Sequence, residues 1–230
     1  MKNTLDIFLD PVDLFKRLDL RPTWLGPFII VASLGILGAF WMSPVMERLM
    51  IAQAPEGLSA EMHEQMMSSI KLSKYYGVVT TPIVVLLQWS VSAFLLFGVA
   101  ILFGADTSYR KTLSVLGHAS IITASYGAVN VAVIYLRGVE TVQSPGAIRA
   151  TVISPAYLLS ASAHPALHVL LENLNPFSLW YFALLGIGLY LTARLSKRQS
   201  AFVVGILWIL QTGFLAGLAL IVSRFSVASM

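Results

Sequence analysis

Two histidines and a glutamate recur at four-residue spacing in the second half of the chain: His164, His168 and Glu172. On a helix this spacing places the three side chains on one face, where neutral imidazoles can ligate zinc and the carboxylate can be a third ligand or the partner of a ligand. The same stripe is typical of the solvated face of an amphipathic outer helix. Because spacing alone is not specific for metal, we favour the solvated face and expect no cofactor.

Four polar side chains fall inside otherwise apolar stretches: Gln88, His118, Asn130 and Gln211. In lipid such groups usually face other helices and hydrogen-bond there, so they predict contacts between helices. The alternative is a pathway for a small solute or ion through an oligomer, lined by His118, Asn130 and Gln88. His118 also follows Arg110 and Lys111 closely, so it could simply reach headgroup water.

No other pattern in the sequence points to an enzyme. The chain has no cysteine, which excludes thiolate metal sites and a cysteine nucleophile. It also has no phosphate-binding glycine loop, no nucleophile elbow and no paired carboxylates within the apolar stretches. His63-Glu64 begins like a zinc-protease helix, but Met67 stands where the second histidine would be. We therefore expect a non-enzymatic protein.

The chain that carries these groups is too apolar for a soluble domain. Of its 230 residues, 57% are hydrophobic and 11% are charged, whereas a soluble domain has roughly 25% charged residues. The net charge of +4 is small and dispersed, which excludes a nucleic-acid partner. The composition predicts an all-α polytopic integral membrane protein.

Five stretches without Asp, Glu, Lys or Arg are long enough to cross a bilayer: residues 24–42, 78–103, 113–136, 177–193 and 202–222. They predict a bundle of five transmembrane helices (24–222) between a cytoplasmic amphipathic arm (1–23) and a short outer tail (223–230). A sixth uncharged stretch, Thr151–Leu171, contains Pro155 and Pro165, which break backbone hydrogen bonds that lipid cannot replace. We expect an interfacial or re-entrant segment followed by a helix there, with a sixth span as the alternative.

The basic residues predict the orientation. With five spans, nine of the 15 basic residues lie on one side: Lys2, Lys16, Arg17, Arg21, Arg110, Lys111, Arg194, Lys197 and Arg198. The positive-inside rule then puts the N-terminus in the cytoplasm and the C-terminus outside. Six spans would move Arg194, Lys197 and Arg198 outward, which the rule disfavours.

Outside the spans, Asp10-Pro11 is typical of a helix start, with Asp as the cap and Pro in the first turn. The apolar stripe of Leu14, Phe15 and Leu18 in this helix either lies on the membrane face or packs under the spans. Ser59 starts a similar amphipathic helix in the first outer loop.

Small residues mark where helices can approach closely. Gly213 and Gly217 form a G-x-x-x-G face, which either joins spans within the chain or makes a homo-oligomer. We favour internal packing.

Two segments, Ser108–Ala119 and Asn175–Trp180, together carry a resemblance to a known family. They are followed by Gly186, Gly188, the basic pair Lys197-Arg198 and Trp208. The chain resembles the Yip-one family, the Ypt/Rab-GTPase-interacting membrane proteins, in its compact prokaryotic-type form. That resemblance implies a cytoplasmic arm, five spans, helix packing through Trp180 and the two glycines, and residence in a bacterial cytoplasmic membrane. Eukaryotic members are implicated in vesicle traffic.

The sequence thus favours a scaffold that organises membrane or holds other membrane or membrane-associated proteins at it. The residues expected to contact partners or anionic lipid are Phe15, Arg17, Arg110, Lys111, Lys197 and Arg198. The competing hypotheses are the solute pathway and, third, the zinc site.

Overall fold

A computed structural model of the chain describes residues 2–52, 54, 59–142, 154–159 and 164–228, and all regular secondary structure in this part is helical. Two short helices open the chain, α1 (Lys2–Leu9) and α2 (Pro11–Leu20). The long helices are α3 (Leu25–Ala52), α4 (Ala60–Leu102), α5 (Tyr109–Arg137) and α9 (Lys197–Ala228). Between α5 and α9 lie η1 (Val139–Thr141), η2 (Pro155–Leu158), α7 (Pro165–Glu172) and α8 (Pro176–Thr192). The prediction of an all-α fold is confirmed.

Four helical segments of the described chain are long and apolar enough to cross a bilayer: Leu25–Ala52, Tyr75–Leu102, Tyr109–Arg137 and Lys197–Ile221. They overlap four of the five predicted spans. The remaining predicted span, 177–193, corresponds to α8, which has only 17 residues. It is long enough to count as a membrane-spanning segment only together with α7, from which it is bent by 62°. The described part therefore carries four spans, or five if this bent pair crosses as one, which makes the chain a polytopic membrane protein.

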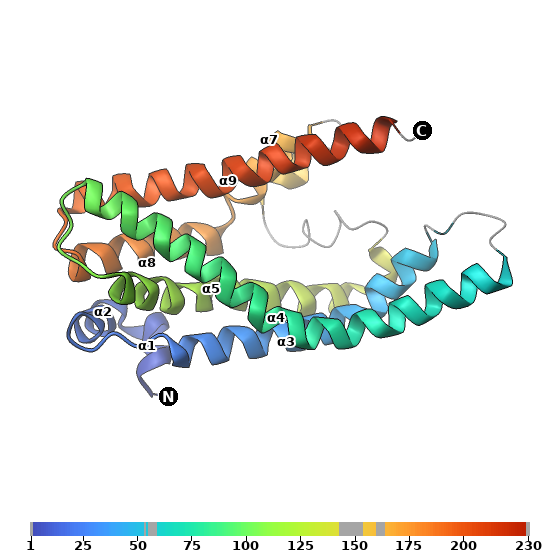
Figure 1. Cartoon of the computed structure of the whole chain (residues 1–230), viewed down its shortest axis with the longest axis horizontal. Coiled ribbons are helices and arrows are strands. Elements are labelled where there is room, and N and C mark those ends of the chain that lie inside the picture. The colour runs from blue at the N-terminus through green and yellow to red at the C-terminus, as the bar shows by residue number, and fades with distance from the viewer. Residues whose placement is uncertain (1, 53, 55–58, 143–153, 160–163, 229–230) are drawn as a thin grey trace.

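The helix that starts at Ser59 continues without a break into the second span. Ser59 caps it, because its Oγ accepts a hydrogen bond from the backbone N–H of Met62 at 3.3 Å. The whole of α4 has 43 residues, so it is about 65 Å long, roughly twice the thickness of a hydrocarbon core. Its first turns therefore extend well beyond its apolar part (Figure 1).

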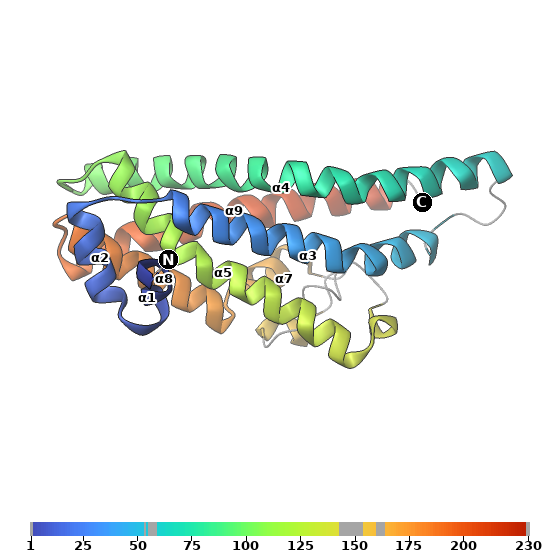
Figure 2. The same cartoon turned by 90° about the horizontal axis from the view of Figure 1, so that it is seen from below.

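The long helices run side by side as a bundle (Figures 1 and 2). Helix α3 packs against α4 and α5, α5 packs against α8, and α9 packs against α4 and α8. Helices α1 and α2 lie at one end of the bundle, where the α4–α5 and α8–α9 connections also lie (Figure 1). The arm and the two connections that carry most of the basic residues therefore meet at the same end.

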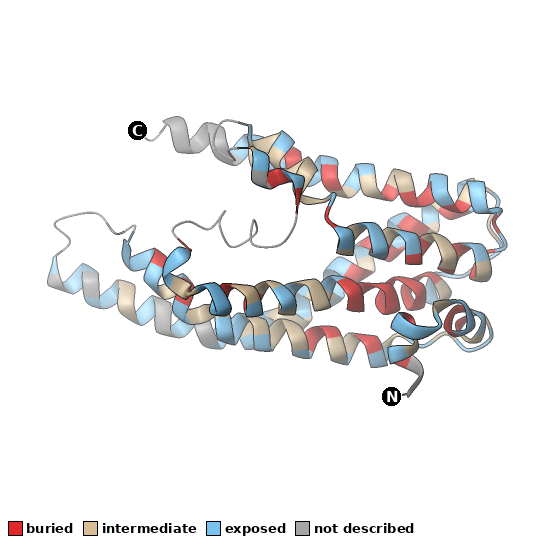
Figure 3. Cartoon of the chain, turned by 180° about the vertical axis from the view of Figure 1, so that it is seen from behind, coloured by how far each residue is buried: buried red, intermediate tan, exposed pale blue. Residues whose placement is uncertain are grey.

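The best-packed part of the core lies in the half of the bundle next to this end (Figure 3). Every residue of α5 from Thr112 to Ile122 is buried. Gly117 in this segment faces the ring of Trp89 on α4, and a Cβ atom at Gly117 would lie 2.8 Å from that ring. Since lipid is as apolar as the side chains, such close approach and van der Waals contact hold membrane helices together.

The described part of Thr151–Leu171 contains η2 and most of α7. Ser154 joins the two, because its Oγ donates a hydrogen bond to the carbonyl oxygen of Leu171 at 2.9 Å. Residues 151–153 and 160–163 lie outside the described residues. The interfacial or re-entrant segment stays a prediction.

Candidate functional site at the basic end

The α2 helix of the arm forms where the sequence predicts it. Asp10 caps it, since its Oδ1 accepts a hydrogen bond from the backbone N–H of Asp13 at 3.0 Å, and Pro11 occupies the first turn. The predicted apolar stripe is buried and packs with the ends of α5 and α8. Leu9 and Leu20 are instead 85% and 82% exposed. The stripe therefore packs under the spans, and other apolar side chains of the arm are left to meet lipid.

Phe15 is an anchor of the arm and does not reach the surface, where we expected it to meet partners. Its side chain has no exposed area. The ring fits beside Gly188 of α8, where a Cβ atom would lie 3.3 Å from Cε1 of Phe15 and 2.3 Å from Cγ1 of Val115 on α5. Gly188 therefore lets α2, α5 and α8 meet, as expected of a packing glycine. Trp180 of α8 holds α1 in the same way, in edge-to-face contact with Phe8 at 5.7 Å between ring centroids.

Two of the expected contact cations are used inside the chain. Arg17 forms ion pairs with Asp6 and Asp13, so that it links α1 to α2. Lys111, at the start of α5, pairs with Asp19 of α2. Each pair is partly exposed and stabilises the fold by about 1 kcal/mol or less, but together they fix the position of the arm on the bundle.

The α4–α5 and α8–α9 connections are also tied to each other. The backbone N–H of Asp106 donates to the carbonyl oxygen of Ala193 at 3.1 Å, and the Asp106 carboxylate pairs with Arg194 at 3.1 Å. The side-chain amide of Gln199 donates to the carbonyl oxygen of Phe103 at 3.1 Å. The two connections thus form one continuous surface beside the arm.

We call residues 2–23, 103–112 and 193–200 the basic end. It contains all five aspartates of the chain. Each has a partner within the basic end: Asp6 and Asp13 bind Arg17, Asp10 caps α2, Asp19 binds Lys111 and Asp106 binds Arg194. Five exposed cations have no acidic partner within 4.0 Å among the described residues: Lys16, Arg21, Arg110, Lys197 and Arg198. The outer surface of the basic end therefore has an excess of positive charge.

The aspartates are the feature that sequence reasoning missed. The sequence does indicate their grouping, because all five aspartates fall in the arm or in the α4–α5 connection, whereas every glutamate lies elsewhere. Counting basic residues alone could not reveal which cations are compensated.

Within the described part of the chain, the three polar residues of the proposed solute pathway do not come together. His118 is 2% exposed, and its Nδ1 lies 2.8 Å from the carbonyl oxygen of Ser114 in its own helix, so it does not reach headgroup water. Gln88 is exposed on α4, and Asn130 is half-buried further along α5. Gln211 does make a contact between helices, since its Nε2 donates to Ser92 Oγ of α4 at 3.1 Å. The geometry gives the solute pathway no support.

The His164, His168 and Glu172 stripe lies on α7 and at its start. The Nδ1 atom of His168 is 3.1 Å from the carbonyl oxygen of Leu159, and His164 is exposed at the helix N-terminus. Among the described residues, no group of three or more His, Cys, Asp or Glu side chains is close enough together to hold a metal ion.

Contrary to expectation, the G-x-x-x-G face of α9 packs against none of the described helices. Among the described residues, a Cβ atom added at Gly213 or Gly217 would meet no atom within 4 Å, and the same is true of Gly186 on α8. Gly213 is exposed. Spacing alone could not separate these glycines from Gly188.

Comparisons with known proteins agree with this architecture. A family model described as the Yip1 domain matches residues 5–220, which include most of the arm, nearly all of the candidate spans and both basic connections. Membrane protein YknW of Bacillus subtilis (strain 168) is 29% identical over 194 residues, covering 84% of this chain and 79% of that protein. No solved structure matches the chain significantly. With the family model spanning almost the whole chain, this protein belongs to the Yip1 domain family of integral membrane proteins.

Proposed function

We propose that this protein is a non-enzymatic membrane scaffold whose basic end holds an acidic partner protein at the cytoplasmic face of a bacterial inner membrane. The observation that carries the proposal is the pairing of charges at this end. All five aspartates are engaged within the basic end, while five exposed cations have no acidic partner there among the described residues.

The construction of the basic end supports a binding surface in preference to a loose loop cluster. Phe15 is buried, the arm is tied to α5 through Lys111, and the two connections are tied through Asp106. A surface that is ordered before binding loses less conformational entropy when a partner docks. Complementary charge on the partner would speed its encounter with this surface and fix its orientation.

The proposed side of the membrane follows from the same residues. Cytoplasmic loops carry an excess of Lys and Arg, and nine of the 15 basic residues of the chain lie in the arm and the two connections. Each cation near an anionic leaflet gains about 1 kcal/mol, so lipid headgroups would also hold this end at the membrane surface.

Site-specific photocrosslinking in living cells tests the proposal. A photoreactive amino acid replaces Arg110 or Arg198, which are exposed and lie on different elements of the basic end. Glu140 is the matched control, because it is exposed and follows α5 at the opposite end of the bundle. We expect the same protein adduct from both basic-end positions and none of that mass from Glu140.

Charge dependence distinguishes a scaffold surface from accidental proximity. With the crosslinker at Arg198, the Arg110→Gln variant should lower the adduct yield, because the partner loses one favourable charge contact. An adduct that is equally strong from Glu140, or crosslinks to lipid alone at both basic-end positions, would contradict the proposal.

A further inference from the structure

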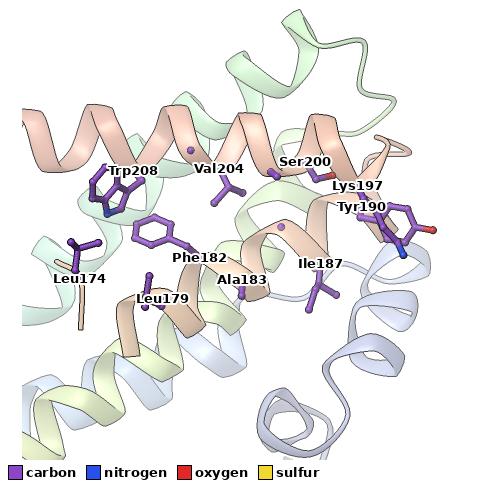
Figure 4. A pocket seen from close by; sticks show the side chains of 13 residues that line it. Leu174, Leu179, Phe182, Ala183, Ile187, Tyr190, Lys197, Ser200, Val204 and Trp208 are labelled. Atoms are coloured by element: carbon purple, nitrogen blue, oxygen red, sulfur yellow. The ribbon is translucent and has the colours of Figure 1, made fainter. Parts of the chain in front are cut away.

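A long apolar groove of about 570 Å³ lies between α8 and α9 (Figure 4). Its volume is within the range of about 300–1,000 Å³ that is typical of sites for small ligands. Leu174, Phe182 and Trp208 line one end, near the bend between α7 and α8. Tyr190 and Lys197 line the other end, next to the basic end of the bundle.

The length of the groove corresponds to one leaflet of a bilayer. From Lys197 to Trp208 the α9 helix rises about 16 Å. Half of a hydrocarbon core is about 15 Å thick. The groove is therefore long enough to reach from a membrane surface at Lys197 to near the bilayer midplane.

The distribution of charge along the groove is one-sided. Among the described residues, Lys197 is the only charged one that lines it, and the other lining residues are apolar, glycine, serine or tyrosine. The Lys197 Nζ lies 5.8 Å from the centre of the Tyr190 ring, at the mouth of the groove. No acidic side chain of the described residues lies within 4.0 Å of it. A cation at the end of an apolar groove, near a membrane surface, suits a lipid with an anionic headgroup and an acyl chain.

We propose that the groove between α8 and α9 binds one anionic glycerophospholipid, with an acyl chain lying along it and the phosphate at Lys197. This inference shares Lys197 with the basic end but does not rest on the scaffold function, because most of the groove lies on the side of the bundle, beyond residues 193–200.

Filling the groove tests the acyl-chain part of the proposal. Gly205 of α9 lines the groove, and a Cβ atom there would meet no atom within 4 Å, so Gly205→Leu places its side chain in open space. Gly213→Leu is the matched control, because Gly213 lies on the same helix, has equally open surroundings and does not line the groove. Gly186→Leu fills the groove from α8 and repeats the test if Gly205→Leu is poorly folded.

The measurement is native mass spectrometry of the full-length protein in detergent, titrated with phosphatidylglycerol or phosphatidylcholine. We expect one retained phosphatidylglycerol on the unchanged protein and on Gly213→Leu. On Gly205→Leu its affinity should fall at least tenfold. The proposal is overturned if Gly205→Leu and Gly186→Leu bind as Gly213→Leu does, or if they abolish a dimer and not a lipid adduct.

The headgroup part of the proposal is tested at Lys197. Lys197→Gln should reduce the preference for phosphatidylglycerol over phosphatidylcholine about fivefold, which corresponds to one basic residue at an anionic surface. The control is Arg198→Gln, since Arg198 is equally exposed but lies over the Phe202 ring and does not line the groove. Equal effects of the two variants would show that general surface charge, and not the groove, selects the lipid.

Discussion

Gly188 offers the sharpest test of how the bundle is packed. In Gly188→Ala the new Cβ atom would lie 2.3 Å from Cγ1 of Val115. Carbon atoms pack at about 3.5–4.0 Å, so α8 and α5 must separate by about 1 Å, or Val115 must leave its rotamer. Overpacking of this kind costs about 1–3 kcal/mol.

The matched control is Gly186→Ala, two residues earlier on the same helix. A Cβ atom there meets nothing within 4 Å, so this variant changes helix propensity without a clash. Because both variants gain the same propensity of about 1 kcal/mol, the difference between them isolates the clash. Val115→Ala in the Gly188→Ala background removes the opposing methyl groups, so it should recover much of the lost stability. The effects of the two substitutions on stability should therefore not add.

Unfolding of membrane proteins in detergent is often irreversible, so the assay compares half-lives of the folded protein at one temperature. Gly188→Ala should lose its fold about five to a hundred times faster than Gly186→Ala, taking 1.4 kcal/mol as a factor of ten. Equal half-lives would refute the close approach of α8 and α5 and the anchor position of Phe15 beside it.

Three further predictions concern the arm and the polar contacts. Phe15→Ala should weaken docking of the arm by about 3–5 kcal/mol, because a fully buried ring is lost, and limited proteolysis should then cleave the arm while the spans stay intact. Gln211→Leu should destabilise the fold by about 0.6 kcal/mol, and by no more than about 1.7 kcal/mol, because its hydrogen bond to Ser92 is lost. Gln88→Leu, on the exposed face of α4, should not destabilise it, and half-lives of the folded protein in detergent compare the two variants. Asp106→Asn should change the stability of the fold in the same assay by less than about 1 kcal/mol, because the aspartate side chain of its ion pair is 73% exposed.

Much of the fold could be predicted because the bilayer imposes strong rules on the sequence. Charges are excluded from spans, so the uncharged stretches overlap α3, α4, α5, α8 and α9. The Asp10-Pro11 signal was equally reliable, since capping depends only on neighbouring residues.

The packing of the glycines, the position of Phe15 and the groove could not be predicted. They depend on which helix faces which, and the spacing of residues within one helix does not give this information. Gly188 and Gly213 are both helical glycines in apolar surroundings, yet only Gly188 faces a crowded neighbour. Phe15 was expected at a surface because the sequence could not say whether its stripe met lipid or the bundle. The α8–α9 groove is lined by side chains from two helices, so no single segment of the sequence reveals it.

If the basic end is one surface on the cytoplasmic side, single cysteines placed in it are shielded from reagents outside the cell. The chain contains no cysteine, so Arg110→Cys, Arg198→Cys and Glu140→Cys each provide a single reactive thiol. In spheroplasts a membrane-impermeant maleimide should label only Glu140→Cys, and all three should react after permeabilisation. Labelling of Arg110→Cys or Arg198→Cys in sealed spheroplasts, or protection of all three positions, would contradict the claim.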